Sequence, residues 1–345
     1  MSSVAPHLLA LLACPACGGA LAAEAGLRCG ACGRAFAAPD GIPCLVGALD
    51  ARATRVRDFY ASAPFPGYPP RDSYAALRAR AQRSEFARLL DAAIAPDATV
   101  LDLGCGTGQM SLFLATGDRL IVGADLTRAS LLLGADAARR FGIGRVRFVE
   151  MDLRAPALRA DAFDVVHCSG VLHHTAEPAT SFRAVARFVR PGGVLVIGVY
   201  NAYARFPHRL RRAVARLSGL RWIPFDPVLR DRAAEPERRR AWLRDQYQHP
   251  EEHRHTLAEV QRWFLASGVE YVRTYPSTVA AEPTPPPGGL FAPATDDWAP
   301  ESLLQQLAWA RTLGREGGLF VVVGRKGGGR RSLRSAGRRD ARASG

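Results

Sequence analysis

Lysine is nearly absent from the 345-residue chain, where Lys326 stands alone beside 45 arginines. Together with the abundance of alanine, this bias is typical of GC-rich codon usage, so the net charge of +14 is weak evidence for a nucleic-acid partner. The charge is also uneven, because residues 325–345 hold eight basic side chains against Asp340 and supply +7 of the total. We expect this basic tail to be disordered, since it has few apolar residues to bury.

Long apolar runs are missing as well. No run approaches the roughly 20 residues that a helix needs to cross a bilayer, which excludes a membrane span. A short apolar stretch ends at Cys14, but no lysine or arginine precedes it, as an export signal would require. With seven cysteines and no convincing signal, we expect a cytoplasmic protein whose thiols stay reduced or bind metal.

Four of the cysteines form two pairs, Cys14-Pro-Ala-Cys17 and Cys29-Gly-Ala-Cys32. The spacing C-x2-C-x11-C-x2-C predicts a tetrahedral thiolate site for Zn²⁺, with Cys14, Cys17, Cys29 and Cys32 as ligands. Four thiolates fill the coordination shell, so this zinc is structural. The metal is needed because a domain of roughly 45 residues cannot bury enough core to fold unaided.

The stretch around which the rest is organised is Thr99-Val-Leu-Asp-Leu-Gly-Cys-Gly-Thr-Gly-Gln109. It predicts a buried strand, a tight turn containing Gly104, Gly106 and Gly108, and a helix from Gln109. Glycines let a ligand lie directly against the main chain. The spacing differs from the dinucleotide pattern G-x-G-x-x-G, because the third glycine comes one residue early and Asp102 stands two residues before the first.

Strands and helices alternate after this turn, which predicts an α/β fold with a mostly parallel sheet covered on both faces. Ligands bind such sheets at the carboxyl ends of the strands. Asp125 ends the second strand, where it can accept hydrogen bonds from two vicinal hydroxyls or cap the next helix. Asp152 follows the third strand and Ser169 ends the fourth. The expected strands are Val100–Leu103, Leu120–Ala124, Val146–Val149, Phe163–Cys168 and Val194–Val199, and the expected helices Gln109–Ala115, Arg128–Arg140 and Pro178–Val189.

These segments resemble the class I S-adenosylmethionine (SAM)-dependent methyltransferases of the type 11 and type 25 groups, in order and spacing over roughly residues 98–200. The resemblance implies a Rossmann-like seven-stranded sheet with an antiparallel last strand, for which Gly318–Gly324 after Val269–Tyr275 is suitable. It implies SAM as co-substrate, with Asp125 on the ribose and Asp152 and Leu153 on the adenine. The full set of implied cofactor-binding residues is Asp102, Gly104, Gly106, Gly108, Asp125, Leu126, Asp152, Leu153 and Ser169.

Two histidines follow the fourth strand, His173 and His174. Either is a candidate general base for a hydroxyl or acidic-carbon acceptor. Tandem histidines are frequent in the resembled family without being catalytic, so the alternative interpretation is that both have a structural role.

The N-terminal segment carries a second resemblance. Leu12-Ala-Cys-Pro-Ala-Cys17 and Pro39-Asp-Gly-Ile-Pro43 resemble the zinc-ribbon-like activators of tRNA methyltransferases, which also occur fused to the front of bacterial methyltransferases. We therefore expect a ribbon at 1–47, a connector and helix at 48–96, a methyltransferase domain at 97–324, and the tail at 325–345. The connector, with Phe59-Tyr60 and the proline-rich Pro64–Pro70, is interpreted as a packed linker or as a lid. A helical insertion with arginine clusters, 200–268, is where substrate recognition is expected.

Three functions remain open at this point. The first is methyl transfer to a small molecule or a protein. The second is tRNA or rRNA methylation, supported by the ribbon and the arginines, although no N-P-P-Y-like quartet follows the fourth strand, where the sequence is Cys168-Ser-Gly-Val171. The third is a non-catalytic SAM-binding scaffold, which the intact glycines and Asp125 disfavour. The sequence names no acceptor and no oligomeric state.

Overall fold

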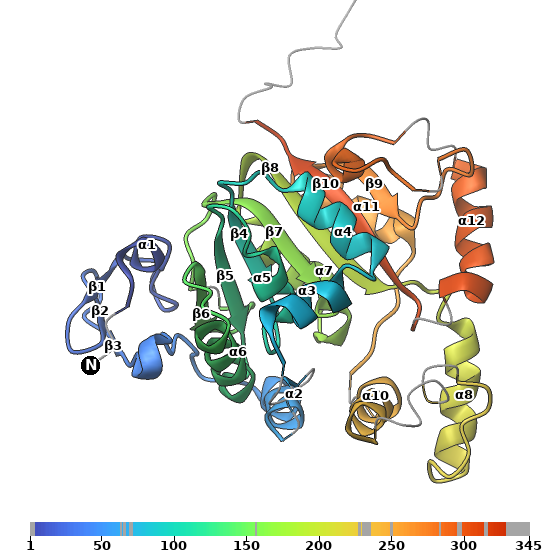
Figure 1. Ribbon diagram of the computed structural model, residues 1–345, viewed down its shortest axis with the longest axis horizontal. Helices are drawn as coiled ribbons and strands as arrows, with labels where there is room; N and C mark the ends of the chain where they lie inside the picture. The colour runs from blue at the N-terminus through green and yellow to red at the C-terminus, as the bar shows by residue number, and fades with distance from the viewer. Residues whose placement is uncertain are drawn as a thin grey trace, which may run out of the picture.

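The computed structural model describes residues 4–62, 64, 67–68, 72–155, 157–226, 229, 236–248, 251–282, 284–294, 299–313 and 317–328. Figure 1 shows a central twisted sheet with helices on both faces and a small N-terminal lobe at one edge. The expected basic tail lies outside the described residues beyond residue 328, and so does most of the proline-rich segment Pro64–Pro70.

The central sheet has seven strands in the order β6-β5-β4-β7-β8-β10-β9. The first five of these pair in parallel, whereas β10 is antiparallel to both β8 and β9. This confirms the expected α/β fold with an antiparallel last strand. The strands are β4 (Thr99–Leu103), β5 (Leu120–Asp125), β6 (Val146–Glu150), β7 (Phe163–Ser169), β8 (Val189–Tyr200), β9 (Val269–Tyr275) and β10 (Leu319–Lys326).

Helices bury a separate apolar cluster on each face of the sheet. One face packs against α4 (Glu85–Ala93), α5 (Gln109–Leu114) and α6 (Arg128–Arg140), and the other against α7 (Pro178–Ala186), α11 (Leu257–Ala266) and α12 (Ala299–Thr312). The helix starts follow local capping chemistry, since the Ser84 and Thr256 hydroxyls accept hydrogen bonds from the first turns of α4 and α11. Both sheet faces are therefore covered, as the unbroken apolar strands require.

The junction of α7 and β8 differs from the expectation. The helix ends at Ala186, and β8 begins at Val189 and runs through Pro191-Gly192-Gly193, which we expected to be a turn outside the sheet. The pairing of β7 with β8 shifts register at this point. A Cβ on Gly193 would press against the carbonyl oxygens of Phe163 and Asp164, so glycine lets the irregular stretch stay in the sheet.

The N-terminal lobe contains α1 (Pro6–Leu9), a three-stranded antiparallel sheet and a 3-10 turn, η1 (Pro39–Gly41). Its strands are β1 (Leu21–Ala23), β2 (Leu27–Cys29) and β3 (Ala35–Phe36). The lobe shares one buried cluster with the central sheet, to which it contributes Leu8, Leu12 and Leu45. Backbone bonds join the two parts: the Leu45 N–H donates to the Glu150 carbonyl at 2.8 Å and the Glu150 N–H to the Pro43 carbonyl at 2.9 Å.

The connector carries two helices, one on each side of its prolines: α2 (Ala51–Ala61) and α3 (Tyr74–Ala81). Asp50 and Ser73 cap them, each accepting from the backbone N–H three residues further on. We expected an extended strap here, because the prolines dominated the pattern. Asp50 and Ser73 are typical N-cap residues, and they indicate where the two helices begin.

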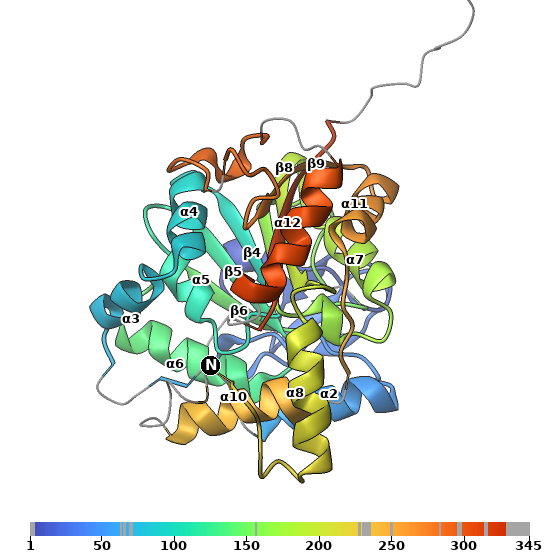
Figure 2. The same cartoon turned by 90° about the vertical axis from the view of Figure 1, so that its right-hand side faces the viewer.

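The insertion after β8 is helical, as expected. It contains α8 (Phe206–Leu217) and α10 (Pro236–Gln248), which pack on each other through Ala215 and Tyr247. Figures 1 and 2 show α2, α10 and α8 at the same end of the molecule. Within the described residues, no helix combines the length and apolar character needed to span a membrane.

Candidate functional site

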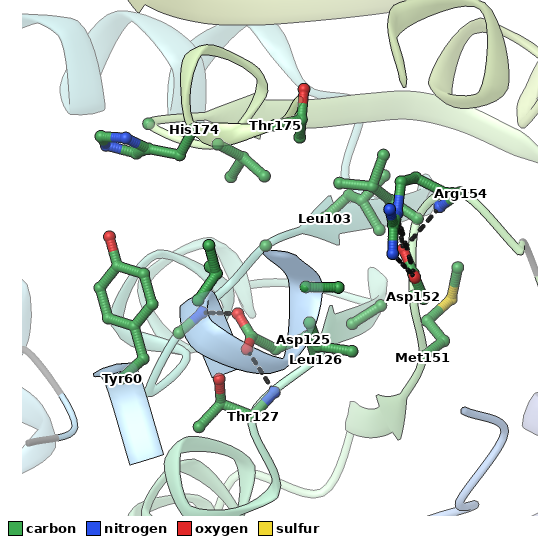
Figure 3. A pocket seen from close by; sticks show the side chains of 18 of the residues that line it. Tyr60, Leu103, Asp125, Leu126, Thr127, Met151, Asp152, Arg154, His174 and Thr175 are labelled. Atoms are coloured by element: carbon green, nitrogen blue, oxygen red, sulfur yellow. Dashed lines mark hydrogen bonds and ion pairs between the residues drawn. The ribbon is translucent and has the colours of Figure 1, made fainter. Parts of the chain in front are cut away.

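A cavity of about 410 Å³ opens at the carboxyl ends of the parallel strands. Its wall comes from the turns after β4, β5, β6 and β7 and from α2 (Figure 3). Apolar side chains such as Leu103, Leu126, Met151 and Leu153 line most of it, with a few polar groups between them. This is the composition of a small-molecule site.

The glycine-rich turn forms one wall. Gly104 and Gly106 line the cavity with φ values of 71° and 54°, which favour glycine. A Cβ on Gly104 would press into the side chain of Val171. Gly108 does not line the cavity: it begins α5 with a φ of 77°, and a Cβ there would meet the Phe148 ring. Gly104 and Gly106 thus form part of the cavity wall, and Gly108 lets the Phe148 ring pack closely against the start of α5.

Asp125 lies at the end of β5, at the centre of the view in Figure 3. Its carboxylate accepts the Gly106 N–H at 2.9 Å and the Thr127 N–H at 2.8 Å. Burial raises the pKa of Asp125, and the two backbone N–H bonds oppose that rise. Asp125 itself is not the N-cap of α6, because Thr127 has that position. Asp125 contacts the start of the helix only through the Thr127 N–H. Each oxygen keeps acceptor capacity beyond its one N–H bond.

Asp152 lines the cavity on one side of Asp125, and its carboxylate is held by Arg154. The Arg154 guanidinium donates to it at 2.8 Å and, with its other nitrogen, to Asp50 at 2.6 Å. Asp50 is the cap of α2, so Arg154 joins the turn after β6 to the start of that helix. No local pattern predicts the role of Arg154, because its partner Asp50 lies 104 residues away.

Helix α2 closes another part of the cavity. Arg52, Val56 and Tyr60 line it from this helix, and Figure 3 shows the Tyr60 ring on the opposite side of Asp125 from Asp152. Arg244 of α10 supports α2 from behind by donating to the Phe59 carbonyl at 3.0 Å. This arrangement matches the lid interpretation of the Phe59-Tyr60 pair.

The two tandem histidines have different places. His174 lines the cavity, and its Nδ1 lies 2.7 Å from the Glu251 carbonyl, so Nδ1 carries the proton. Burial lowers the pKa of His174 to about 4, and the ring is neutral at physiological pH. His173 lies outside the cavity wall and stacks on Tyr200 with ring centroids 3.8 Å apart. Ser169, Thr175 and Glu251 line the same end as His174.

Asp102 lies away from the cavity, in contrast to what the family resemblance implies. Its buried carboxylate accepts the Ser111 hydroxyl at 2.6 Å and contacts His167 Nδ1 at 2.9 Å. These partners lie on α5 and β7, so Asp102 ties both to β4. The reason is strand alternation: Leu103 faces the cavity, and its neighbour therefore points to the other face of the sheet.

The four cysteines of the N-terminal lobe converge, with all four Sγ atoms within 4.8 Å of one another. Two of the Sγ···Sγ distances are 3.7 Å (Cys14 to Cys32) and 3.5 Å (Cys17 to Cys29). A Zn–S bond of about 2.3 Å in a tetrahedral site places neighbouring sulfurs about 3.8 Å apart. The two shorter distances are close to this value, so the four thiols are a candidate site for a zinc ion.

Two family models match the chain. Residues 101–197 match a methyltransferase domain, and residues 6–41 match the Trm112p-like proteins. The first match spans β4 to β8 and the second contains the four cysteines.

Curated relatives match over the same central region. The chain is 36% identical over 158 residues to a trans-aconitate 2-methyltransferase of Azoarcus sp., which covers 44% of this chain and 58% of that protein. It is 34% identical over 107 residues to a ubiquinone biosynthesis O-methyltransferase of Paracidovorax citrulli, covering 31% and 45%. An uncharacterised protein of Synechococcus sp. is 29% identical over 197 residues, covering 50% and 47%. The chain thus spans about half the length of the curated relatives it matches.

Two solved structures superpose on the chain at low identity. A complex of the Haloferax volcanii Trm112 methyltransferase activator with a methyltransferase superposes with a TM-score of 0.45 at 17% identity, covering 81% of this chain and 100% of that one. The magnesium protoporphyrin IX methyltransferase of Synechocystis superposes with a TM-score of 0.47 at 15% identity, covering 80% and 99%.

Proposed function

We propose that this protein methylates a small-molecule acceptor with SAM, because residues 101–197 match a methyltransferase domain and residues 6–41 match the Trm112p-like proteins. The observation that carries the proposal is the cavity with Asp125 at its centre and two glycines in its wall.

The cavity residues divide into three groups along its length. Asp152 and Leu153 lie at the end suited to an adenine ring, and Asp125 accepts two hydroxyls of a ribose. Gly104, Gly106 and Ser169 border the part left for the methionine portion. The implied contacts of Asp102, Gly108 and His173 are not part of this proposal, because all three lie outside the cavity wall.

SAM brings an already activated methyl group, so the protein's main tasks are orientation of the acceptor and exclusion of water. Tyr60 and His174 lie together at the end of the cavity away from Asp152 (Figure 3). The neutral His174 ring donates its Nδ1 proton to the Glu251 carbonyl, so Nε2 is the unprotonated nitrogen of the ring. With a pKa of about 4, it is a weak base and positions a proton more than it removes one.

Two of the relatives support a small-molecule acceptor: the trans-aconitate 2-methyltransferase and the ubiquinone biosynthesis O-methyltransferase are both named as enzymes that methylate small molecules. A second candidate is RNA, which the match of residues 6–41 to Trm112p-like proteins favours. The two are distinguished by incubating the protein with methyl-labelled SAM and a cell extract, and then measuring label in the RNA fraction and in the fraction of small metabolites.

We further propose that Cys14, Cys17, Cys29 and Cys32 hold a structural zinc ion. Four thiolates would leave no open coordination position, so the ion supplies folding free energy and not chemistry. We also propose a cytoplasmic location, where these thiols would stay reduced and able to bind the ion.

Replacing Asp125 with alanine is the direct test of the cofactor site. One charge-assisted hydrogen bond contributes about 1.5–3 kcal/mol, so we expect SAM affinity to fall by at least roughly 10- to 150-fold. The measurement is isothermal titration of the zinc-loaded protein with SAM. Asp118→Ala is the matched control, because Asp118 is exposed and far from the cavity. Absence of SAM binding in the folded wild-type protein, or equal affinity of the Asp125 variant, would overturn the proposal.

The pH profile of the reaction tests the state of His174. Since burial lowers the pKa of His174 to about 4, we expect no titration from this residue in kcat/KM between about pH 6 and 8. His174→Asn keeps a donor for the Glu251 carbonyl, and should lower kcat/KM by roughly tenfold without changing the shape of the profile. Loss of a wild-type titration near pH 6.5 in this variant would contradict the neutral assignment.

A further inference from the structure

Helix α8 exposes one long face to solvent. Residues 206, 209, 210, 213, 216 and 217 are all exposed, and this spacing places them on a single side of the helix. Three of them are large and apolar: Phe206 is 54% exposed, Leu210 57% and Leu217 90%. A solvent-facing helix side normally carries polar residues, so this face is unusual.

The turn after α8 continues the apolar surface. Trp222 is 62% exposed and Phe225 92%. The backbone of Phe225 has a φ of 54°, a left-handed conformation that is unfavourable for a bulky side chain. The chain therefore holds an aromatic ring out in solvent at a conformational cost. We name α8 together with residues 218–225 the α8 surface.

The charge of the α8 surface has one sign. Residues 203–225 include six arginines and no acidic residue. Arg209, Arg216 and Arg221 are exposed, and none of them forms an ion pair with another described residue. Arg205 and Arg212 point the other way and pair with Glu252. The outward side of α8 therefore carries positive charge.

The inner side of α8 already satisfies the needs of folding. Ala215 and His208 are buried against α10, with the His208 and Tyr247 ring centroids 4.9 Å apart. The outer apolar side chains contribute nothing to this packing. Their retention on an exposed face indicates a partner.

We propose that the α8 surface docks on an anionic lipid bilayer. Aliphatic and aromatic side chains beside arginines on one exposed face of a helix are the features of an interfacial membrane helix. Leucines 90% and 57% exposed fit acyl chains, whereas RNA offers no apolar surface for aliphatic side chains. A second copy of this chain is disfavoured, because a twofold contact places Arg209, Arg216 and Arg221 against the same arginines.

Docking in this way brings the cavity towards the bilayer. Arg205, the residue before α8, binds Glu252 at 2.9 Å, and Glu251 lines the cavity end that holds His174. Figure 2 shows α8 projecting at the same end of the molecule as α2 and α10. This part of the inference rests on the proposed function: the acceptor would be an amphiphile dissolved in the membrane.

The test is flotation of the full-length, zinc-loaded protein with vesicles of phosphatidylcholine alone or mixed with phosphatidylglycerol. We expect binding to the mixed vesicles only, weakened by salt. Leu217→Asp should reduce the partition coefficient by at least about tenfold. Arg209→Gln with Arg216→Gln should reduce it by roughly fivefold for each arginine.

Two matched controls keep the result specific. Leu265→Asp changes a leucine that is 81% exposed on α11, and Arg88→Gln an exposed arginine on α4; both should bind vesicles like the wild type. Equal vesicle binding by the Leu217 variant, no binding by the wild type, or salt-dependent binding of RNA through the same residues would overturn the proposal. SAM titration of the same samples separates this outcome from failure of the methyltransferase proposal.

Discussion

Replacing Cys29 with serine should remove the proposed zinc ion and unfold the N-terminal lobe. Cys29 is buried, and its Sγ lies 3.5 Å from that of Cys17, so serine leaves three thiolates around the ion. Structural zinc contributes an apparent binding free energy of about 10–16 kcal/mol in small domains, and most of it is folding free energy. The lobe shares a core with the central sheet, and the loss should therefore also lower the melting temperature of the whole chain.

Zinc content by mass spectrometry and thermal unfolding measure this result. Cys44→Ser is the control, because Cys44 lies outside the cluster and contacts Arg128 at 3.1 Å, a contact that a hydroxyl can replace. The control should keep one zinc per chain and the wild-type melting temperature. A Cys29 variant with full zinc content and unchanged unfolding would show that the four thiols are not a metal site.

Replacing Glu252 with glutamine should destabilise the protein by about 3–5 kcal/mol, because it leaves a buried guanidinium without its counter-charge. Arg205 is fully buried, binds Glu252 at 2.9 Å and stacks 3.7 Å over the Tyr200 ring. Arg212 binds the same carboxylate at 2.7 Å. Denaturant unfolding measures the change, and Glu24→Gln, which breaks an exposed pair with Arg28, should change stability little.

The same pair predicts an acid-dependent stability. Burial opposes ionisation of Glu252, but the charges of Arg205 and Arg212 outweigh it and lower its pKa to about 2. A carboxyl whose folded pKa is depressed stabilises the protein above its unfolded pKa of about 4.3, and this contribution is lost as the pH falls towards 2. The Glu252 variant should lack this part of the acid dependence. An unchanged acid transition in the variant would contradict the assignment.

Local signals made the central part of the fold predictable. The apolar strands, the glycine turn and Asp125 at a strand end each depend on a few adjacent residues, and their alternation with helices predicts a parallel sheet. The antiparallel last strand was implied by the family resemblance. The cysteine spacing is also a local signal, since each pair of thiols is three residues apart.

Pairings between distant segments could not be predicted. Arg154 holds Asp152 and Asp50, and only folding brings the connector to the third strand. Helix α2 was hidden by the prolines that follow it, so Arg52 and Val56 in the cavity wall had no signal. Asp102 has the residue type that the family motif expects. Strand alternation nevertheless directs its side chain away from the cavity, and its contacts with Ser111 and His167 depend on the folded arrangement of α5 and β7.

Backbone hydrogen bonds between residues 43–45 and Glu150 hold the N-terminal lobe on the central sheet of the same chain. Two separate proteins joined by such an interface would come apart on dilution, with a balance set by their concentrations. In this chain the short tether to α2 makes the contact intramolecular, at an effective concentration that mixing cannot change. Every chain therefore has one N-terminal lobe for each cavity, and this ratio does not depend on the expression level. No separate lobes remain to bind another protein.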